Sequence, residues 1–450
     1  MAKKEIEHTS TTLGNQDMKG SQRMVSVVEP YELPEGWKWC RLGEVAKFER
    51  GITFPASAKE KEKNENNIPC LRTANVQENI ELEDLIYVNK SFMKNNIKKL
   101  IQNNDIVFSS ANSRELVGKS AFISNVSFPM TFGGFILCIR ATNSNSKFLF
   151  YFLRLHFLLG RFMGKSTQTT NIANINTETL SNIIIPLPPT QDEQQRIVNR
   201  IESMFAKLDE AKEKAQNVVD GFETRKAAIL HKAFTGELTA KWRKENGVSD
   251  DSWVVKTIGE ICLVKGGKRV PKGMSLIKEK NEHPYLKAGN LKFGTVIDKD
   301  MEYVPNDVFI LIKNYTVNAG DVYITNVGAC IGDCGIIPDY YHGASLTENA
   351  VKLTEMICNN SYLAKQLSSN LVQTQIKSKI KSATLGKLSI DNIKQLKINL
   401  PTLPEQQEIV RILDIIIGKE RIAKQAAENV LEQIDLLKKS ILARAFRGEL

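Results

Sequence analysis

Apolar residues recur every seven positions in two otherwise polar segments, residues 190–240 and 402–450. In the first segment the two apolar phases are Ile197, Met204, Ala211 and Val218, and Ile201, Leu208, Ala215, Phe222 and Ile229. In the second they are Ile409, Ile416, Ala423, Val430 and Leu437, and Leu413, Ala427, Ile434 and Ile441. We expect two long helices that pair along this seam as an antiparallel coiled coil; an ordinary amphipathic helix in a globular core is the alternative.

The two helical segments are copies of each other. Residues 193–238 align without a gap with residues 405–450, and 19 of the 46 aligned pairs are identical. Both copies open on Glu-Gln-Gln and end on Ala-Phe-x-Gly-Glu-Leu. The spacing from Thr190 to Glu193, and from Thr402 to Glu405, fits a capping box at a helix start. A period this long is too large for a solenoid and indicates a duplicated unit, a large domain followed by a helix.

The domains that precede the helices repeat only at scattered anchors. Matching anchors are Trp37 with Trp253, Gly43-Glu44 with Gly259-Glu260, Pro69-Cys70-Leu71 and Asn75 with Pro284-Tyr285-Leu286 and Asn290, and Asp105 with Asp321. Between these anchors the two domains differ almost completely. Two domains of one fold with different loops are what readers of two different targets would show.

Short β-type runs alternate with one helical run in each domain. The β-type runs include residues 105–109, 121–123, 135–139 and 321–325, and the helical runs lie near 148–162 and 362–379. This mixture predicts two similar α/β (α+β) domains that alternate with the two long helices. The expected boundaries are a disordered tail at 1–30, a first domain at 31–189, a central helix at 190–240, a second domain at 241–401 and a distal helix at 402–450.

Charge and cysteine content narrow the class of protein. The chain of 450 residues carries a net charge of +10, and the excess falls in residues 1–188 and 241–400 while the helical segments are near neutral. That distribution suits domains facing a polyanion. Seven scattered cysteines without a signal peptide favour free thiols in the cytoplasm. The most apolar run, Phe148–Met163, is too short and too charged for a membrane span.

Three motifs occur in the same order in both halves. They are the opening Leu33-Pro34-Glu35-Gly36-Trp37 with Leu42-Gly43-Glu44, the exit Ile185-Pro186-Leu187-Pro188-Pro189 into Glu193-Gln194-Gln195, and the helix end Ala233-Phe234-Thr235-Gly236-Glu237-Leu238. In this arrangement the chain resembles the specificity subunit of type I restriction–modification systems, in which two target-recognition domains alternate with a central and a distal helix.

The resemblance implies a non-catalytic reader of double-stranded DNA. It also implies two adenine-N6 methyltransferase subunits and restriction/translocase subunits as partners. The chain itself would bind no cofactor, and S-adenosylmethionine, ATP and Mg would belong to the partners. Independently, two domain–helix units paired through their helices form a pseudo-dimer, which predicts a bipartite DNA site. Because the loops of the two domains differ, the half-sites should differ in sequence.

Polar and basic residues on the diverged loops are the candidates for DNA contact. Arg and Lys suit phosphates and guanine edges, and Asn and Gln suit adenine edges. In the first domain they are Arg72, Thr73, Asn75, Asn112, Ser113, Arg114, Lys165, Thr167, Gln168, Thr169 and Asn171. In the second domain they are Lys268, Arg269, Lys272, Lys287, Asn290, Lys381, Ser382, Thr384 and Lys387. For each residue taken singly, a solvated loop position is the more common explanation.

Catalytic signatures are absent from the sequence. It has no Asn-Pro-Pro-Tyr-type or Asp-Pro-Pro-Tyr-type methyltransferase motif, no Walker A loop and no H-x-x-x-H metal helix. Cys330-x-x-x-Cys334 lacks a second ligand pair nearby, so we predict no metal site. Two alternatives stay open: a coiled-coil scaffold or adaptor whose basic domains bind RNA or protein, and an enzyme that acts without partners.

Overall fold

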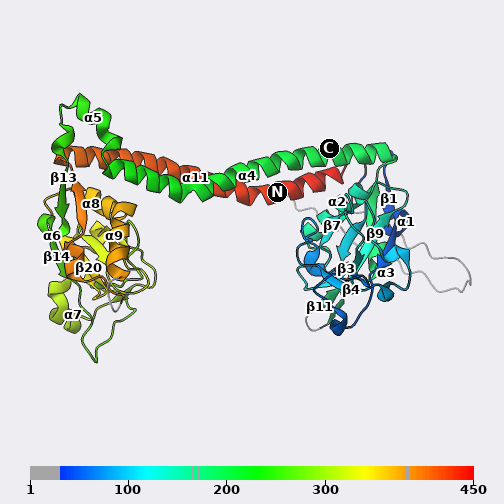
Figure 1. Ribbon diagram of the computed structural model, residues 1–450, viewed down its shortest axis with the longest axis horizontal. Coiled ribbons are helices and arrows are strands. Elements are labelled where there is room, and N and C mark those ends of the chain that lie inside the picture. The colour runs from blue at the N-terminus through cyan, green and yellow to red at the C-terminus, as the bar shows by residue number, and fades with distance from the viewer. Residues whose placement is uncertain (1–30, 164–166, 170–171, 382–385) are drawn as a thin grey trace, which may run out of the picture. The chain divides into compact units, whose positions relative to one another are not determined.

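The computed structural model describes residues 31–163, 167–169, 172–381 and 386–450, which fall into two compact units (Figure 1). The first unit holds the chain up to Glu210 together with Gln433–Leu450, and the second holds Ala211–Glu432. Each unit contains one mixed α/β domain and one stretch of paired helices. The tail predicted at residues 1–30 lies outside the described residues.

A four-stranded antiparallel sheet organises the domain of the first unit. Its order is β2 (Ala46–Arg50), β9 (Ile136–Ala141), β5 (Ile106–Ser109) and β7 (Ser120–Phe122). Beside it lie a sheet of β4 (Ile86–Asn89), β3 (Asn67–Leu71) and β8 (Thr131–Phe132), a pair of β1 (Lys38–Arg41) with β12 (Ile184–Leu187), and a sheet of β10 (Thr167–Thr169), β11 (Ile172–Asn174) and β6 (Ala111–Asn112). Every residue of β5 is buried, because the strand is covered on both faces.

The domain of the second unit repeats this topology, except that its described residues contain no counterpart of the sheet of β10, β11 and β6. Its four-stranded sheet runs β14 (Leu263–Gly266), β20 (Ala350–Thr354), β17 (Val322–Thr325) and β18 (Cys334–Ile336). Its second sheet is β16 (Glu302–Tyr303), β15 (Pro284–Leu286) and β19 (Ser345–Leu346), and β13 (Val254–Thr257) pairs with β21 (Lys397–Leu400). The β-type runs predicted at 105–109, 121–123, 135–139 and 321–325 all overlap strands, so the α/β prediction is confirmed.

Short helices complete both domains. The first domain has α1 (Leu42–Val45), α2 (Ser146–Leu158) and α3 (Thr177–Ser181). The second has α6 (Ile258–Ile261), α7 (Asn306–Ile312), α8 (Asn360–Leu367), α9 (Asn370–Lys381) and α10 (Ile390–Lys394), and α5 (Ala240–Glu245) precedes it. The single helix expected at 362–379 is therefore wrong. It breaks at Ser368 and Ser369, whose hydroxyls donate hydrogen bonds to preceding carbonyl oxygens and compete with the helix.

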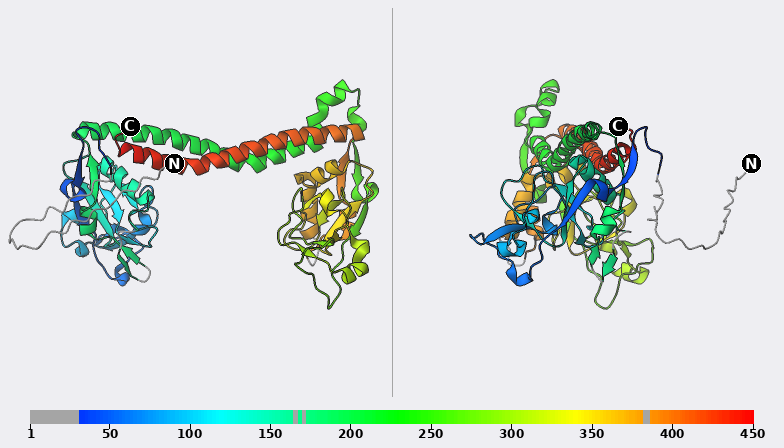
Figure 2. Two further views of the ribbon diagram at one scale, coloured as in Figure 1. Left: turned by 180° about the vertical axis from the view of Figure 1, so that it is seen from behind. Right: turned by 90° about the vertical axis from the view of Figure 1, so that its right-hand side faces the viewer.

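The long helices α4 (Gln191–Phe234) and α11 (Leu403–Ala445) pair antiparallel, as predicted (Figures 1 and 2). In the first unit the start of α4 lies beside the end of α11, where Lys438 Nζ is 2.6 Å from Asp209 Oδ1. In the second unit the end of α4 lies beside the start of α11, where Arg225 Nε is 2.8 Å from Glu420 Oε2. Arg225 and Glu420 stand at heptad positions that are otherwise apolar, seven residues after Val218 and Leu413, and they form an ion pair with each other.

The apolar seam of the helix pair departs from the predicted one in α11. Among the predicted seam positions, Ile197, Ile201, Phe222, Ile409, Leu413 and Ile434 are buried, and Met204, Leu208, Val218 and Ile416 are half-buried. Val430 and Leu437, however, are 41% and 47% exposed, so their assignment to the seam is corrected. A helix with 3.6 residues per turn drifts about 20° per heptad against a strict seven-residue repeat, which carries the later members of this phase to the surface.

The repeated Ala-Phe motif closes each domain against a helix end. Phe446, at the end of α11, packs into the core of the first unit with ring centroids 5.0 Å from Phe148 and 5.3 Å from Phe152. Phe234, at the end of α4, packs against Tyr362 of α8 at 5.3 Å. Both phenylalanines are fully buried. Each domain is therefore fastened to the helix that follows it and to the end of the other helix.

Candidate nucleic-acid interface

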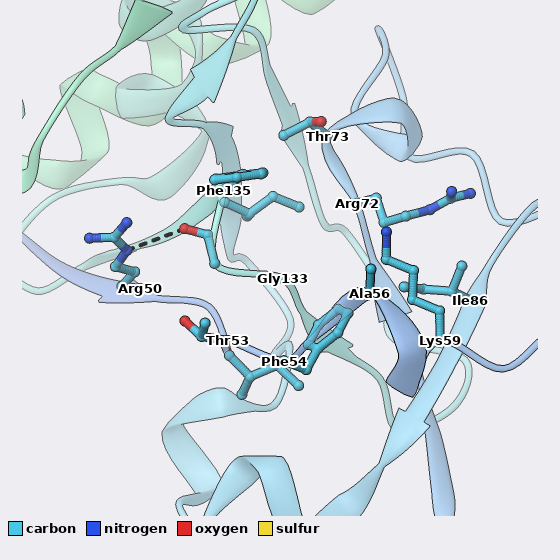
Figure 3. A pocket seen from close by; sticks show the side chains of 13 residues that line it. Arg50, Thr53, Phe54, Ala56, Lys59, Arg72, Thr73, Ile86, Gly133 and Phe135 are labelled. Carbon is cyan, nitrogen blue, oxygen red and sulfur yellow. Dashed lines mark hydrogen bonds between the residues drawn. The ribbon is translucent and has the colours of Figure 1, made fainter. Parts of the chain in front are cut away.

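Each domain contains a cavity at its edge. In the first domain it lies between the loop after β2 and the loop before β9, and in the second between the loop after β14 and the loop before β20. The first cavity, of about 420 Å³, is lined by Arg50, Ile52, Thr53, Phe54, Ala56, Lys59, Arg72, Thr73, Ile86, Gly133, Gly134, Phe135 and Ile136 (Figure 3). The second cavity, of about 720 Å³, is lined by Arg269, Val270, Pro271, Lys272, Gly273, Met274, Ser275, Leu276, Tyr285, Lys287, Ala288, Gly289, Glu302, Thr347, Glu348 and Asn349.

The two cavities occupy equivalent places in the repeated fold. The backbone hydrogen bonds Ile52 N to Phe132 O and Lys268 N to Leu346 O are both 2.8 Å. In each domain the strand pair behind the cavity is parallel, β3 with β8 and β15 with β19. The same chain path therefore shapes both cavities.

Matching glycines bring the cavity walls together. A Cβ added to Gly51 would lie 2.1 Å from the carbonyl oxygen of Gly133, and one added to Gly267 would lie 2.0 Å from that of Thr347. Because backbone atoms cannot yield to such an overlap, only glycine fits at either position. Both halves therefore use a glycine at the same position, where two backbone segments come close together.

The linings of the cavities differ in chemistry. Three cations and two phenylalanines surround the first cavity, and no carboxylate is among the residues that line it. In the second cavity the basic residues face acids: Arg269 Nε lies 2.5 Å from Glu348 Oε1, and Lys287 Nζ lies 3.0 Å from Glu302 Oε2. The lining of the first cavity therefore contains cations without acids, whereas in the second cavity acids within the lining neutralise two of the three cations.

The ion pair of the second cavity alters the titration of its acid. Burial acts to raise the pKa of Glu348, but hydrogen bonds from Arg269, from the Glu348 backbone and from Thr347 outweigh it, so the pKa is lowered. Nearby, burial raises the pKa of Tyr285 to about 12. Its hydroxyl donates a 2.9 Å hydrogen bond to the carbonyl oxygen of Lys268. The second cavity therefore keeps a carboxylate and a neutral phenol at neutral pH.

Of the candidates predicted in the first domain, two line the first cavity, Arg72 and Thr73. Ser113 and Arg114 are exposed on a neighbouring loop, and Asn112 is half-buried, with its amide donating to Ser109 Oγ at 3.1 Å. In the second domain, Arg269, Lys272 and Lys287 line the second cavity. Lys268 and Lys387 are exposed, and Lys268 Nζ lies 5.6 Å from the centroid of the Tyr315 ring.

Two predicted asparagines hold loops in place instead of facing solvent. Asn75 is buried; its Oδ1 accepts from the Arg72 backbone at 2.8 Å and its amide donates to Glu81 O at 3.0 Å. Asn290 is buried and makes the equivalent bonds to Lys287 and Lys299. Because the polar groups of both side chains are engaged with backbone, we leave the two residues out of the proposed interface.

Several predicted contacts fall where side chains are not described. Lys165, Asn171, Ser382 and Thr384 lie outside the described residues. Only the backbone is described for Thr167, Gln168 and Thr169, on β10, and for Lys381, at the end of α9.

Sequence reasoning missed the most exposed aromatic ring of the site. Phe135 is 59% exposed at the rim of the first cavity. It opens the apolar run 135–139, which the sequence analysis took for a buried strand, while the strand itself begins at Ile136. Arg50 is the last residue of β2, and Lys59 lies between β2 and β3. Both were missed because the sequence does not reveal how these strands pair. The preceding Gly133-Gly134 pair was the available signal for a backbone that turns at this point.

The described residues contain no group of three or more His, Cys, Asp or Glu side chains placed to hold a metal ion. Within the same residues, no helix combines the length and apolar character needed to cross a membrane. The seven cysteines are free, and only Cys330 is not buried. Cations line both cavities, Arg50, Lys59 and Arg72 in the first and Arg269, Lys272 and Lys287 in the second, which suits binding of a polyanion.

Comparison with known proteins gives a consistent result over nearly the whole chain. The family model described as "Type I restriction modification DNA specificity domain" matches residues 34–219 and 250–433. The chain is 28% identical over 444 residues to the type I restriction enzyme EcoKI specificity subunit of Escherichia coli strain K12, covering 93% of this chain and 90% of that protein. It is 25% identical over 436 residues to the putative MjaX specificity subunit of Methanocaldococcus jannaschii, covering 93% and 95%.

A solved structure has the same fold. The HsdS subunit from Thermoanaerobacter tengcongensis matches with a TM-score of 0.65 at 20% identity, covering 94% of this chain and 99% of that one. At this identity the likeness concerns the fold alone.

Proposed function

The chain belongs to the type I restriction modification DNA specificity family, as a non-catalytic specificity subunit, and from this we propose that it reads a bipartite, asymmetric DNA site. Each domain reads one half-site of double-stranded DNA. Partner adenine-N6 methyltransferase subunits modify the target base with S-adenosylmethionine, and restriction subunits join them for cleavage. The chain supplies recognition and positioning, and the partners supply the chemistry.

The observation that carries this proposal is the pair of equivalent cavities with different linings. Matched hydrogen bonds and matched glycines give the same frame to both, so the frame presents both sets of loops in the same way. Arg50, Arg72 and Lys59 on one frame, and Arg269, Lys272 and Lys287 on the other, present cations of different geometry to the ligand. Guanidinium and ammonium groups suit phosphates and guanine edges, so the two half-sites should share a docking pose and differ in sequence.

The paired helices have a separate role in this proposal, which is to set the spacer between half-sites. With 44 and 43 residues, α4 and α11 are each about 65 Å long, compared with about 34 Å for a turn of DNA. Insertion of one heptad near Ala215 should lengthen the tolerated spacer or abolish binding. If the spacer stays the same, the helices do not set the distance.

Methylome mapping tests the function directly. In cells that carry the partner methyltransferase gene, we expect N6-methyladenine at one bipartite motif when this chain is present and at none when it is deleted. Methylation at an uninterrupted motif, or a motif that persists after deletion, would contradict the proposal. Gel shifts of the purified chain against random duplexes separate it from the scaffold alternative, because an adaptor would enrich no bipartite sequence.

Domain exchange tests the division of labour. Replacing residues 33–188 with the equivalent domain of a relative should change the first half-site and leave the second intact. The reciprocal exchange of residues 253–400 is the matched control and should change only the second. If either exchange alters both half-sites, the domains do not read independently.

A further inference from the structure

The first cavity offers two kinds of surface to a ligand. Figure 3 shows the side chains of Arg50 and Phe135 at one side of the opening and those of Arg72 and Lys59 at the other, with Phe54 between them. A volume of about 420 Å³ lies within the range of sites that bind small organic ligands. The occupant should therefore combine a flat apolar part with a negative charge.

The positive charge at the opening is available to such an occupant. Arg50 donates from Nε to the carbonyl oxygen of Gly134 at 3.2 Å, a neutral partner that leaves its charge uncompensated. Arg72 pairs with Asp84 at 2.7 Å, but Asp84 is 93% exposed, so solvent screens that pair strongly. No carboxylate is among the lining residues described, which distinguishes this opening from the second cavity.

The aromatic rings are fixed by the backbone and by a neighbour. The carbonyl oxygen of Phe135 accepts from the backbone N–H of Ser110 at 2.9 Å and from its hydroxyl at 3.0 Å, so the ring is exposed on an anchored backbone. Phe54 packs against Phe92 with centroids 6.1 Å apart. Any of the planar bases can stack on such rings, and arginine adds a cation–π contribution.

The second cavity is a built-in comparison. Equivalent backbone bonds place Val270 where the first domain has Phe54, and Asn349 where it has Phe135. Arg269 and Lys287 there are already paired with acids. The second cavity thus lacks the two phenylalanine rings, and of its three lining cations only Lys272 is outside these ion pairs.

We propose that the first cavity binds one nucleotide unit, with its base against Phe135 and Phe54 and its phosphate toward the surrounding cations. This inference rests on the proposed function: the nucleotide is one that leaves the base stack of the first half-site, and its unstacking cost is offset by stacking on the rings. A free nucleotide has the same chemistry, and the experiment separates the two sources. The second cavity accepts no unstacked base, so the two half-sites are read differently.

Photo-crosslinking of the full chain tests this. The duplex carries the selected bipartite site with halogenated bases, 5-iodopyrimidines or 8-bromopurines, placed one at a time at every position of both half-sites. A second arm uses free 5-iodo-dUMP. Crosslinks are located by mass spectrometry on the tryptic peptides 51–59, which contains Phe54, and 120–140, which contains Phe135. We expect one position of the first half-site to crosslink to these peptides, and no position of the second half-site to crosslink to residues of the second cavity.

The variant Phe135→Leu keeps an apolar side chain and removes the ring. Because Phe135 is largely exposed, folding should be unaffected. The crosslink should fall at least tenfold, and affinity for the selected duplex should fall by roughly 5- to 150-fold. Asn349→Ala, at the equivalent position of the second cavity, is the matched control and should leave the crosslink to peptides 51–59 and 120–140 unchanged.

The outcomes separate the inference from the function on which it rests. A crosslink in the duplex arm assigns the nucleotide to DNA, and a crosslink with 5-iodo-dUMP alone assigns it to a free nucleotide. If the chain selects a bipartite duplex but neither arm labels the two peptides, the cavity inference is wrong and the proposed function stands. If the chain selects no bipartite duplex yet 5-iodo-dUMP labels the cavity, the cavity binds a nucleotide and the proposed function is wrong.

Discussion

The two domain–helix junctions have matching glutamine contacts in both halves of the chain, whereas the two cavities have different linings. At the junctions, Gln194 accepts a 2.8 Å hydrogen bond from the backbone of Asn145, and Gln406 accepts one of the same length from Asn359. At the cavities, the equivalent positions hold different residue types. The packing around a buried amide or ring limits which residue type can stand there. A residue on a cavity rim has few such contacts, so its type can change with the ligand.

The junctions also differ at one identical residue, which shows that identity alone does not fix a role. Glu193 is paired on the surface with Arg196, one turn along α4. Glu405, its copy, is fully buried and accepts from Arg243 Nη1 at 2.7 Å, Thr239 Oγ1 at 2.7 Å and Trp253 Nε1 at 3.2 Å. The partners of Glu405 come from the segment around α5. The same carboxylate therefore forms a surface ion pair in one unit and a buried ion pair with further hydrogen bonds in the other.

The largest effect is expected where the junctions agree. Phe446→Ala and Phe234→Ala each remove a fully buried ring and should destabilise their own unit by about 3–5 kcal/mol. Urea unfolding, monitored separately in each unit by hydrogen exchange, measures the loss of unfolding free energy. Phe135→Ala, at an exposed ring, is the control and should cost less than about 0.5 kcal/mol. Equal losses in all three variants would mean that the buried rings do not fasten the domains.

The helix pair offers a second contrast between buried and exposed apolar residues. Ile434→Ala should cost about 2–5 kcal/mol because the side chain is buried between the helices. Leu437→Ala, one turn later in the same helix, should stay within about 0.5 kcal/mol because nearly half of that side chain is exposed. Denaturant midpoints of the two variants provide the measurement. A larger loss for Leu437 would restore the strict heptad as the packing seam.

The copies of the glutamate should respond differently to loss of charge. Glu405→Gln replaces the charged partner of Arg243 Nη1 with a neutral amide, while Arg243 Nε keeps its pair with Asp250. The change should cost about 1.5–3 kcal/mol, the range of hydrogen bonds to charged groups. Glu193→Gln weakens a surface pair and should cost at most about 0.5 kcal/mol. Urea unfolding of both variants gives the comparison. Similar losses at the two positions would show that burial of Glu405 does not matter to stability.

The smallest effect concerns the acid that only the second cavity has. The pKa of Glu348 is lowered in the folded chain, so the stability it contributes is present above its unfolded pKa and is lost as pH falls through the folded value. Arg269→Ala removes the main opposing hydrogen bond and should raise that pKa, because burial then acts unopposed by it. Carboxyl NMR titration measures the change. A pKa that stays low in the variant would assign the lowering to the backbone and Thr347 instead.

Much of the fold could be read from local patterns. Capping spacings, the heptads and the long alignment predicted two helices and their antiparallel pairing, because helical periodicity is a property of neighbouring residues. The predicted site is less complete. Arg72 and Thr73 were found because they follow an anchor strand, whereas Arg50 and Phe135, far apart in sequence, meet only when β2 pairs with β9.

The sequence by itself determined the duplicated plan, the helix pairing and the family, since these depend on residue types at fixed spacings. The tertiary structure alone decided that Val430 and Leu437 turn to the surface, that Asn75 and Asn290 serve the backbone, and that Glu193 and Glu405 have different surroundings. The reason is physical: burial and hydrogen-bond partners depend on which distant segments come together, and that information lies in no local stretch of the chain.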